Sequence, residues 1–201
     1  MGDIFSIEGE KRLVIFDLGG VIMPIRMELT AEAFRKLGVV DIKAHVTSSH
    51  AHDGIFHEYQ EGTLSTSDFV ELFKRQTAIE ASDDEIHLAW NAMLYPPNSA
   101  RLSIIEEMRK KHRVVILSNT NEMHIAEARR MMAVYGGFER YFDNVYCSNE
   151  IHMSKPDRDI FEYVLREEGV GAADSVFFDD SPLNVEAAKA IGIDARLVEA
   201  L

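Results

Sequence analysis

The second half of the sequence alternates short apolar runs with longer stretches whose apolar residues recur at helical spacing. Each helical stretch ends at a glycine, which is a common stop signal for a helix. Strands that alternate with helices are joined by right-handed crossovers, so they form a parallel sheet with helices on both faces. The sequence therefore predicts an α/β fold with strands near 114–117, 144–147, 176–178 and 195–198 and helices near 121–135, 156–168 and 182–191.

One more strand is expected near the N-terminus, where the apolar run Leu13–Phe16 is followed by Asp17. Consecutive apolar residues are typical of a strand that is buried on both faces, and open α/β sheets bind ligands at the carboxyl ends of their strands. Gly19 and Gly20 come next, and a glycine lets the backbone approach a ligand or ion that a Cβ would keep away. Because an apolar run that ends in Asp is common in α/β proteins, a functional role for Asp17 depends on the other strand ends.

A long stretch without a convincing strand separates this first strand from the next one. Ser65 and Ser82 are each followed three residues later by an acidic residue, the pattern of a capping box, and apolar residues at helical spacing come after both. The stretch is many times longer than the usual connection of about two to six residues. We therefore expect residues 28–95 to form a small α-helical cap inserted after the first strand, and residues 1–27 and 96–201 to form the α/β core.

Composition excludes several classes of protein. The 201 residues include 21 basic and 34 acidic side chains, which gives a formal net charge of −13, whereas surfaces that bind nucleic acid or anionic membranes need clustered Lys and Arg. No apolar run approaches the roughly 20 residues needed to cross a bilayer, and no apolar signal core precedes the first strand. The single cysteine, Cys147, fits a reducing compartment. We expect a cytoplasmic protein that binds neither nucleic acid nor membrane and is a monomer or a weak dimer.

Polar side chains follow the predicted strands at the points where the strands end. They are Asp17 after the first strand, Ser118 and Asn119 after the second, Lys155 before the helix that follows the third, and Asp179 and Asp180 after the fourth. Parallel strands point the same way, so these groups should converge on one edge of the sheet. Three close carboxylates repel one another unless a cation lies among them, and Mg²⁺ takes oxygen ligands and keeps waters for a substrate phosphate. With a hydroxyl and a lysine, the set suits phosphoryl transfer.

Four short motifs, in this order, resemble those of the haloacid dehalogenase superfamily, in the branch with a helical cap after the first motif. They are Asp17-x-Gly-Gly-Val, Ser118-Asn119-Thr120, Lys155-Pro156-Asp157 and Phe177-Phe178-Asp179-Asp180-Ser181. The resemblance covers nearly the whole chain and is closest to small phosphatases that act on sugar phosphates such as glucose 1-phosphate. It implies a doubly wound, Rossmann-like core, a phosphatase that works through an aspartyl-phosphate intermediate, and Mg²⁺ as the cofactor.

The resemblance also implies which residues hold the metal. Asp17 matches the nucleophile and a metal ligand, and the backbone carbonyl of Gly19 matches a second metal ligand. Asp180 matches the acidic metal ligand, with Asp179 beside it as the alternative or as a residue behind the metal. Carboxylates are known to form aspartyl-phosphates, so Asp17 is a reasonable nucleophile.

Three further residues are expected to hold the substrate phosphate. Ser118 matches the phosphate-binding hydroxyl, and Asn119 matches a neighbouring substrate-binding group. Lys155 matches the catalytic lysine that balances charge on the nucleophile and the phosphoryl group. The substrate that these groups imply is a small phosphorylated metabolite.

The sequence departs from the family pattern at Gly19, where most phosphatases of the superfamily carry a second aspartate as general acid and base. General acid–base catalysis contributes roughly 10²-fold to 10⁴-fold, so turnover should be slow unless another group substitutes. His152 lies in the loop before Lys155, but it is more typical of a surface histidine than of a replacement. The alternative is a phosphate-ligand binder that kept the fold and lost turnover. A metal-free dehalogenase is disfavoured because Asp179 and Asp180 would remain unneutralised.

Other polar residues have less specific interpretations. Asn184 is expected either behind the site or on a solvated helix surface. Asn121 and His124 are expected to be a helix cap and a surface residue, and Trp90 is expected in the core of the cap. The cap histidines lack the spacing of a zinc pair; they are His45, His50, His52 and His57.

Overall fold

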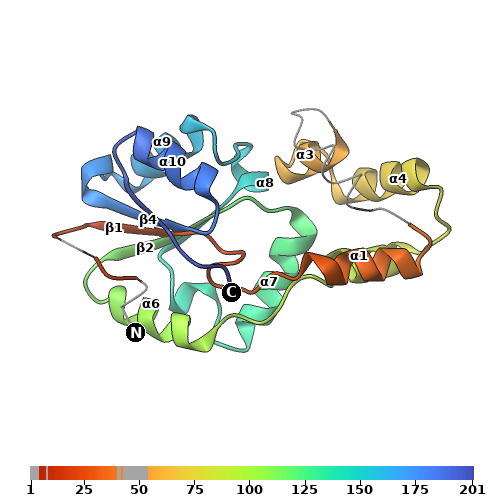
Figure 1. Cartoon of the computed structure of the whole chain (residues 1–201), viewed down its shortest axis with the longest axis horizontal. Coiled ribbons are helices and arrows are strands. Elements are labelled where there is room, and N and C mark those ends of the chain that lie inside the picture. The colour runs from red at the N-terminus through yellow and green to blue at the C-terminus, as the bar shows by residue number, and fades with distance from the viewer. Residues whose placement is uncertain (1–4, 8, 40–41, 43–53) are drawn as a thin grey trace.

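The computed structural model describes residues 5–7, 9–39, 42 and 54–201, and it shows an α/β core with a group of helices beside it (Figure 1). One sheet contains the strands β1 (Leu13–Phe16), β2 (Arg113–Ser118), β3 (Asn144–Cys147), β4 (Ser175–Asp179) and β5 (Asp194–Leu197). Their order in space is β3-β2-β1-β4-β5, and each neighbouring pair is parallel. The chain builds outward from β1 in both directions, so the predicted doubly wound α/β fold is confirmed.

Helices cover both faces of this sheet. On one face lie α6 (Ser99–Met108) and α7 (Glu122–Ala133), and on the other lie α9 (Arg158–Glu168) and α10 (Pro182–Ala190) (Figure 1). Successive residues of a strand point to opposite faces. Central strand β1 accordingly supplies side chains to both hydrophobic clusters, Val14 and Phe16 to one and Leu13 and Ile15 to the other. This two-sided burial explains why β1 is apolar throughout.

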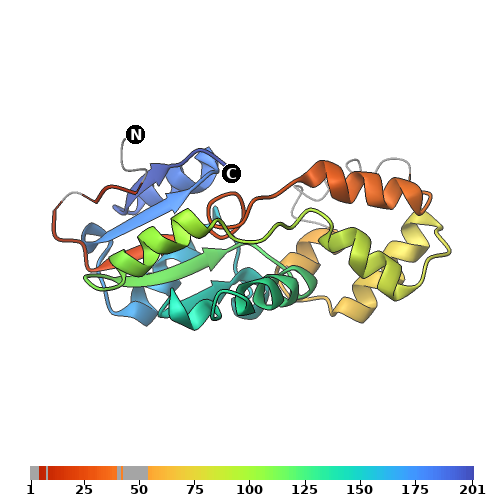
Figure 2. The same ribbon diagram turned by 90° about the horizontal axis from the view of Figure 1, so that it is seen from below.

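The described helices between β1 and α6 form a separate group beside the sheet, as the view turned by 90° shows (Figure 2). They are α1 (Met27–Lys36), α3 (Ile55–Gln60), α4 (Thr66–Thr77) and α5 (Asp83–Asn91). Their apolar faces meet in a cluster of their own that contains Phe34, Phe69, Phe73 and Trp90. The rings of Phe69 and Trp90 pack edge to face with centroids 5.0 Å apart, so aromatic packing holds this group together.

Side-chain caps fix the starts of two of these helices. Ser82 begins α5 with a complete capping box, because its side chain accepts from the Glu85 N–H and the Glu85 carboxylate accepts from the Ser82 N–H. Ser65 begins α4 by accepting from the Asp68 N–H. The Asp68 carboxylate accepts a hydrogen bond from the Ser65 hydroxyl at 2.6 Å and does not accept one from the Ser65 N–H. The predicted capping box at Ser65 is therefore only half formed.

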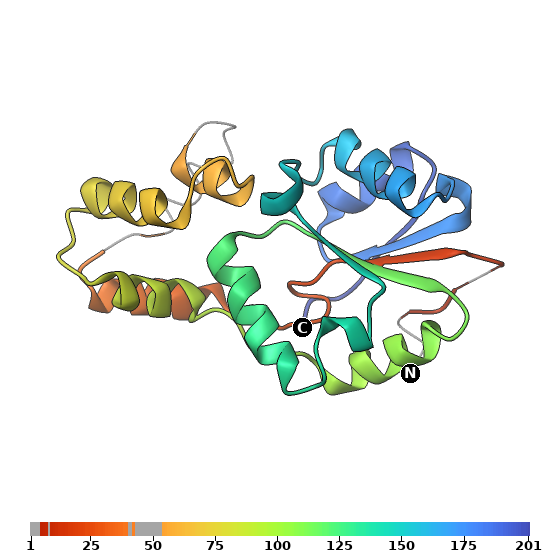
Figure 3. The ribbon, with the colours of Figure 1, turned by 180° about the vertical axis from the view of Figure 1, so that it is seen from behind.

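Two linkers join the helical group to the core, and they run side by side (Figure 3). Ile25 on the outgoing linker and Leu94 on the returning one form an isolated antiparallel bridge. On either side of that bridge, the Arg26 N–H donates to the Met93 carbonyl at 2.9 Å and the Tyr95 N–H donates to the Pro24 carbonyl at 3.2 Å. The paired linkers are placed close to the carboxyl edge of β1, where Asp17 lies.

The structure adds one element that the sequence pattern does not predict. The short helix α8 (Ser148–Ile151) follows β3 directly and ends at His152, whose φ is 56°. Helix α9 then begins at Arg158, two residues after the predicted start. Within the described part of the chain, no helix combines the length and the apolar character that a membrane span requires.

Candidate active site

The carboxyl edge of the sheet contains a cavity of about 280 Å³. Its lining includes the polar residues Asp17, Ser118, Asn119, Lys155 and Asp180, which the sequence analysis singled out. They come from the ends of β1, β2 and β4 and from the loop before α9. The predicted convergence of these side chains on one edge is therefore observed, with Asp179 directly behind them.

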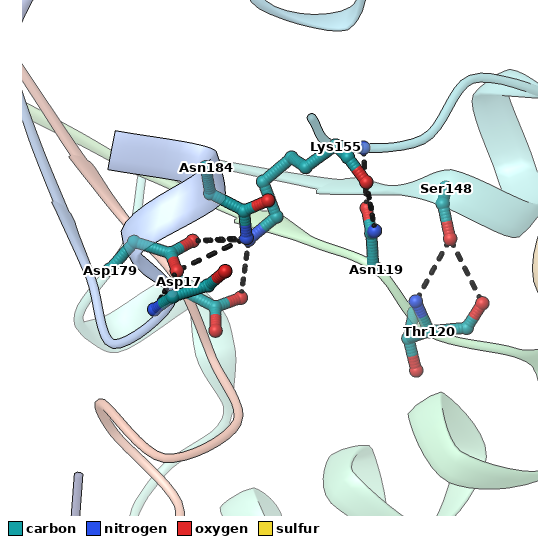
Figure 4. Close-up of polar contacts among 8 residues, drawn as sticks. Asp17, Asn119, Thr120, Ser148, Lys155, Asp179 and Asn184 are labelled. Carbon is teal, nitrogen blue, oxygen red and sulfur yellow. Dashed lines mark hydrogen bonds and ion pairs between the residues drawn. The ribbon is translucent and has the colours of Figure 1, made fainter. Parts of the chain in front are cut away.

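Lys155 lies at the centre of this group and is buried (Figure 4). Its Nζ atom donates to Asp17 Oδ1 at 2.7 Å and to Asp179 Oδ2 at 2.8 Å. Burial alone would lower the pKa of Lys155, but the two carboxylates raise it above its ordinary value. The lysine is therefore a permanent cation between two anions, and it holds Asp17 in one orientation.

The two adjacent aspartates at the end of β4 have different surroundings. Asp179 is fully buried, and besides Lys155 its carboxylate accepts from the Ser181 N–H at 2.7 Å and from the Asn184 side chain at 3.1 Å (Figure 4). Asp180 is half-buried and lines the cavity. Asn184 lines the cavity and also holds Asp179. The hydrogen bonds of Asp179 are directed to protein groups, whereas Asp180 faces the cavity.

Three carboxylates meet closely enough to hold a cation. One oxygen from each of Asp17, Asp179 and Asp180 lies within 4.8 Å of the other two. Burial, partly offset by Lys155, raises the pKa of Asp17 to about 6, and burial together with Asp179 raises the pKa of Asp180. A divalent cation would relieve both penalties, because it stabilises the ionised carboxylates.

The loop after Asp17 is shaped to bring backbone close to these carboxylates. Gly20 has a φ of +74°, and a Cβ built on it would lie 2.1 Å from Asp180 Oδ2. A side chain at this position would displace the Asp180 carboxylate from the cavity. The residues present thus fit a hard cation such as Mg²⁺, with carboxylate and carbonyl oxygens as the donor set.

Ser118 and Asn119 continue the site on the other side of Lys155. Ser118 is buried and lines the cavity. The side-chain amide of Asn119 donates to the Lys155 carbonyl at 2.7 Å and accepts from the Lys155 N–H at 2.8 Å (Figure 4). Both ends of this amide are bound to the Lys155 backbone, so Asn119 positions the lysine loop.

A proton donor is missing where the family usually has one. Gly19 has no side chain, and a Cβ built there would lie 3.3 Å from Ile25 Cγ1, so an apolar side chain fills the adjacent space. His152 is exposed, and its Nδ1 atom lies 2.7 Å from the Glu61 carbonyl in the helical group. His152 does not line the cavity, so it is not the replacement.

His124 was predicted to be a surface residue, and that prediction is wrong. It lines the cavity, and its ring stacks on Trp90 with centroids 5.4 Å apart. Its Nε2 atom lies 3.2 Å from the Trp90 carbonyl and its Nδ1 atom lies 3.1 Å from Asn121 Nδ2. Burial lowers the pKa of His124 to about 4, so the ring is neutral near pH 7. No local sequence pattern indicates this contact, because Trp90 lies far from His124 in the chain.

The same contacts tie the helical group to the core. Asn121 caps α7 as predicted, and its side-chain oxygen also accepts from the Trp90 indole at 3.3 Å. Tyr59 is a second tie, because its hydroxyl accepts from the Met123 N–H at 3.0 Å. Ser148 is a third tie, and its side chain is fully buried. Its hydroxyl oxygen lies 2.9 Å from the Thr120 nitrogen in the core (Figure 4). The same oxygen lies 2.7 Å from the Gln60 carbonyl in the helical group.

The histidines of the predicted cap are only partly covered by the structure. His45, His50 and His52 lie outside the described residues. His57 lies in α3, with Nε2 3.5 Å from a carboxylate oxygen of Glu61. Among the described residues, one group of three acidic, histidine or cysteine side chains is close enough together to hold a metal ion. It consists of Asp17, Asp179 and Asp180.

Comparison with known proteins identifies the family of this chain. Residues 11–192 match the model of the haloacid dehalogenase-like hydrolases. The chain is 30% identical to a D-ribitol-5-phosphate phosphatase from Bacteroides thetaiotaomicron, over 90% of this chain and 88% of that protein. It is 26% identical to a phosphorylated carbohydrates phosphatase from Thermotoga maritima, over 90% of this chain and 82% of that protein.

Solved structures give the same result for the fold. A haloacid dehalogenase family enzyme from Bacteroides thetaiotaomicron, crystallised as a magnesium complex, superimposes with a TM-score of 0.88 at 29% identity over 96% of this chain and 95% of that one. The same enzyme with magnesium and inorganic phosphate gives a TM-score of 0.83 at 28% identity over 94% and 95% of the two chains. The family predicted from the four motifs is confirmed, and the chain belongs to the haloacid dehalogenase-like hydrolases.

Proposed function

We propose that this hydrolase cleaves the phosphate monoester of a small neutral sugar or polyol through an aspartyl-phosphate on Asp17. The observation that carries the proposal is the pair formed by Asp17 and Asp180, which line one cavity with Ser118 while Lys155 fixes Asp17 from behind. The enzyme is a phosphatase, in keeping with its relatives. Its cofactor is Mg²⁺, in keeping with the magnesium complexes of similar structures.

In this proposal Asp17, the Gly19 carbonyl and Asp180 hold the ion, and Asp179 is the residue behind it. Asp179 is the less suitable ligand because its carboxylate already accepts from Lys155, Ser181 and Asn184. When bound, Mg²⁺ neutralises charge on the phosphoryl oxygens and helps to hold them against the nucleophile.

The residues of the chain then carry the reaction in two steps. The Asp17 carboxylate attacks phosphorus, so that its bond to phosphorus forms while the bond from phosphorus to the substrate oxygen breaks. The departing alkoxide takes its proton from water, since Gly19 offers none. Water then attacks phosphorus and gives a proton to the hydroxide left by the first step, while the bond between phosphorus and the Asp17 oxygen breaks. Inorganic phosphate leaves, and the Asp17 carboxylate is restored. Ser118 donates to a phosphoryl oxygen, and Lys155 keeps Asp17 ionised and oriented.

The cavity lining supports a neutral leaving group. Away from the phosphate-binding groups it is lined by Met23, Ile25, Met93 and Leu94, which belong to the paired linkers. Among the described residues that line the cavity, Lys155 is the one lysine or arginine, and it is already bound to two carboxylates. A second anionic group on the substrate would meet no free cation there, so a monophosphate of an uncharged alcohol is favoured.

A second candidate function rests on Gly19. Ile25 fills the space beside it, so the chain is also compatible with a binder of sugar phosphates that turns over extremely slowly. The two candidates share the same binding site and differ in whether phosphate is released.

The test is a panel of phosphate esters assayed with Mg²⁺, comprising D-ribitol 5-phosphate, glucose 1-phosphate and 2-phosphoglycolate. We expect phosphate release from the polyol and sugar esters and at least about tenfold lower kcat/KM for 2-phosphoglycolate, which carries a carboxylate. Hydroxylamine trapping of acid-quenched enzyme should convert Asp17, located by peptide mass mapping, to its hydroxamate. Tight binding of a sugar phosphate without release would favour the second candidate, and a hydroxamate on another residue would exclude Asp17 as the nucleophile.

A further inference from the structure

Arg101 is a buried arginine next to the acidic site. Of the described lysines and arginines, Lys155 and Arg101 are the two that are buried. Arg101 lies in the first turn of α6, and its guanidinium lies 5.5 Å from the centroid of the Phe5 ring. Burying a guanidinium is costly unless its donors are satisfied, so the partners of Arg101 indicate what it does.

Those partners are main-chain oxygens of two segments that flank the site. Nη1 donates to the carbonyls of Gly20 and Val21, and Nη2 donates to the Glu199 carbonyl at 3.1 Å. Other arginines of this acidic chain pair with carboxylate side chains, as Arg109 does with Asp143. Arg101 therefore directs its hydrogen bonds to the backbone of the loop after the nucleophile.

The loop that Arg101 holds packs against Asp180 at Gly20. The Gly20 carbonyl also accepts from the Leu201 N–H at 2.8 Å, so it is held from two sides. A Cβ on Gly20 would lie 2.1 Å from Asp180 Oδ2, which shows how tightly this loop packs against the carboxylate. A shift of the Gly20 backbone would therefore move both the Gly19 carbonyl and the space available to Asp180.

We propose that Arg101 is a positioning residue of the metal site, which fixes the Gly19–Gly20 backbone so that the Gly19 carbonyl and the Asp180 carboxylate face the same ion. This inference rests on the proposed function, because it takes these two groups as ligands of Mg²⁺. Arg101 is not among the residues that line the cavity. Residues that orient metal ligands typically change metal affinity by roughly 10-fold to 100-fold when they are removed.

The test compares Arg101→Met and Arg101→Lys with Arg109→Met in the full chain. Arg109 is the matched control because it directly follows the C-terminus of α6 and is partly buried. It donates to two main-chain carbonyls and to Asp143, away from the cavity. Metal binding is measured without substrate by the loss of the free-ion EPR signal of Mn²⁺, and the Mg²⁺ concentration for half-maximal activity is measured beside it.

We expect Arg101→Met to weaken Mn²⁺ binding by roughly tenfold or more and to raise the half-maximal Mg²⁺ concentration in parallel, with kcat largely recovered at saturating Mg²⁺. Arg101→Lys, which keeps the charge but loses the fork of donors, should show an intermediate loss and carries the test if the Met variant does not fold. Arg109→Met should lower Tm and leave metal affinity unchanged.

Unchanged Mn²⁺ affinity in a folded Arg101 variant would overturn the inference, as would an equal loss in Arg109→Met. Failure of the proposed function is a separate result, because it would appear in the wild-type protein as the absence of Mn²⁺ binding or of phosphate release.

Discussion

The sheet edge and the neighbouring helical group contribute to the site in opposite ways. At the sheet edge, the ends of β1 and β4 and the loop before α9 bring charged groups within hydrogen-bond distance of one another, with Lys155 at 2.7 and 2.8 Å from two carboxylates. The helical group packs aromatic side chains among themselves and reaches the cavity through the linker residues Met93 and Leu94. The charged groups therefore lie at the sheet edge, whereas the insertion has its own hydrophobic cluster and its linkers supply apolar lining to the cavity.

The two regions also depend on different forces. Electrostatic pairing in a buried setting is sensitive to the loss of a single partner, because the remaining charge is left unpaired. Aromatic packing tolerates similar substitutions more readily, since volume and shape matter more than any one atom. Changes at the sheet edge should therefore abolish turnover or stability, and changes in the helical group should alter which substrate is preferred.

The largest effect is expected for Asp17→Asn. The amide is nearly isosteric but cannot form an acyl-phosphate, so kcat should fall by at least about a thousandfold, while the fold survives. Phosphate release with the preferred ester and Tm by calorimetry provide the measurement. Turnover above a few per cent of the wild-type value in a folded variant would show that Asp17 is not the nucleophile.

Lys155→Met should have the next largest effect, on stability as well as on activity. It leaves Asp17 and Asp179 as an uncompensated buried pair, which should lower the free energy of unfolding by roughly 3–5 kcal/mol in metal-free protein. Urea unfolding measures the loss. The double variant Lys155→Met, Asp179→Asn should recover part of the lost free energy of unfolding. If it is no more stable than Lys155→Met, unpaired charge is not the cause of the loss.

A chimera tests whether the helical group determines substrate preference. Residues 28–95, the region proposed as the cap, are replaced by the corresponding segment of a relative with a different substrate preference. We expect kcat/KM ratios between esters to change by roughly tenfold, because they depend on contacts with the leaving group, while Mg²⁺ dependence stays the same. A chimera that kept the original ranking would assign selectivity to core residues such as His124.

The smallest effect concerns pH. The pKa of Asp17 in metal-free protein is raised to about 6, so the carboxylate takes up a proton as pH falls through that value and the proton competes with the metal. Protonation of Asp17 alone should weaken Mn²⁺ binding by about fourfold when the pH falls from 7 to 5.5. Asp17→Asn should bind the metal more weakly without this pH dependence, and an unchanged pH dependence in that variant would assign the titration to another group.

Much of the sheet could be predicted from the sequence because its signals are local. Strand β3 begins and ends at the predicted residues, and the Ser82–Glu85 capping box starts α5 as expected. Helix α8 escaped prediction because four residues are too few to show helical periodicity.

Other features depend on contacts between distant segments. Asp179 and Asp180 are adjacent in sequence, so no pattern indicates which one faces the cavity, and the answer comes from Asn184 on α10 and Lys155 before α9. His124 similarly becomes a cavity residue because α5 places Trp90 against it. Asn119 was expected beside the substrate, and its observed bonds to the Lys155 backbone could not be seen from a motif.

The Ser148 hydroxyl has a consequence for how easily the two regions can separate. It has one proton and two carbonyl acceptors, Gln60 in the helical group at 2.7 Å and Thr120 in the core at 3.0 Å, while its oxygen also accepts from the Thr120 N–H. If α3 moved away from α8, rotation about one bond would transfer the proton from the first acceptor to the second. The Ser148 hydroxyl would keep an acceptor, so the loss of its bond to Gln60 would by itself cost little free energy.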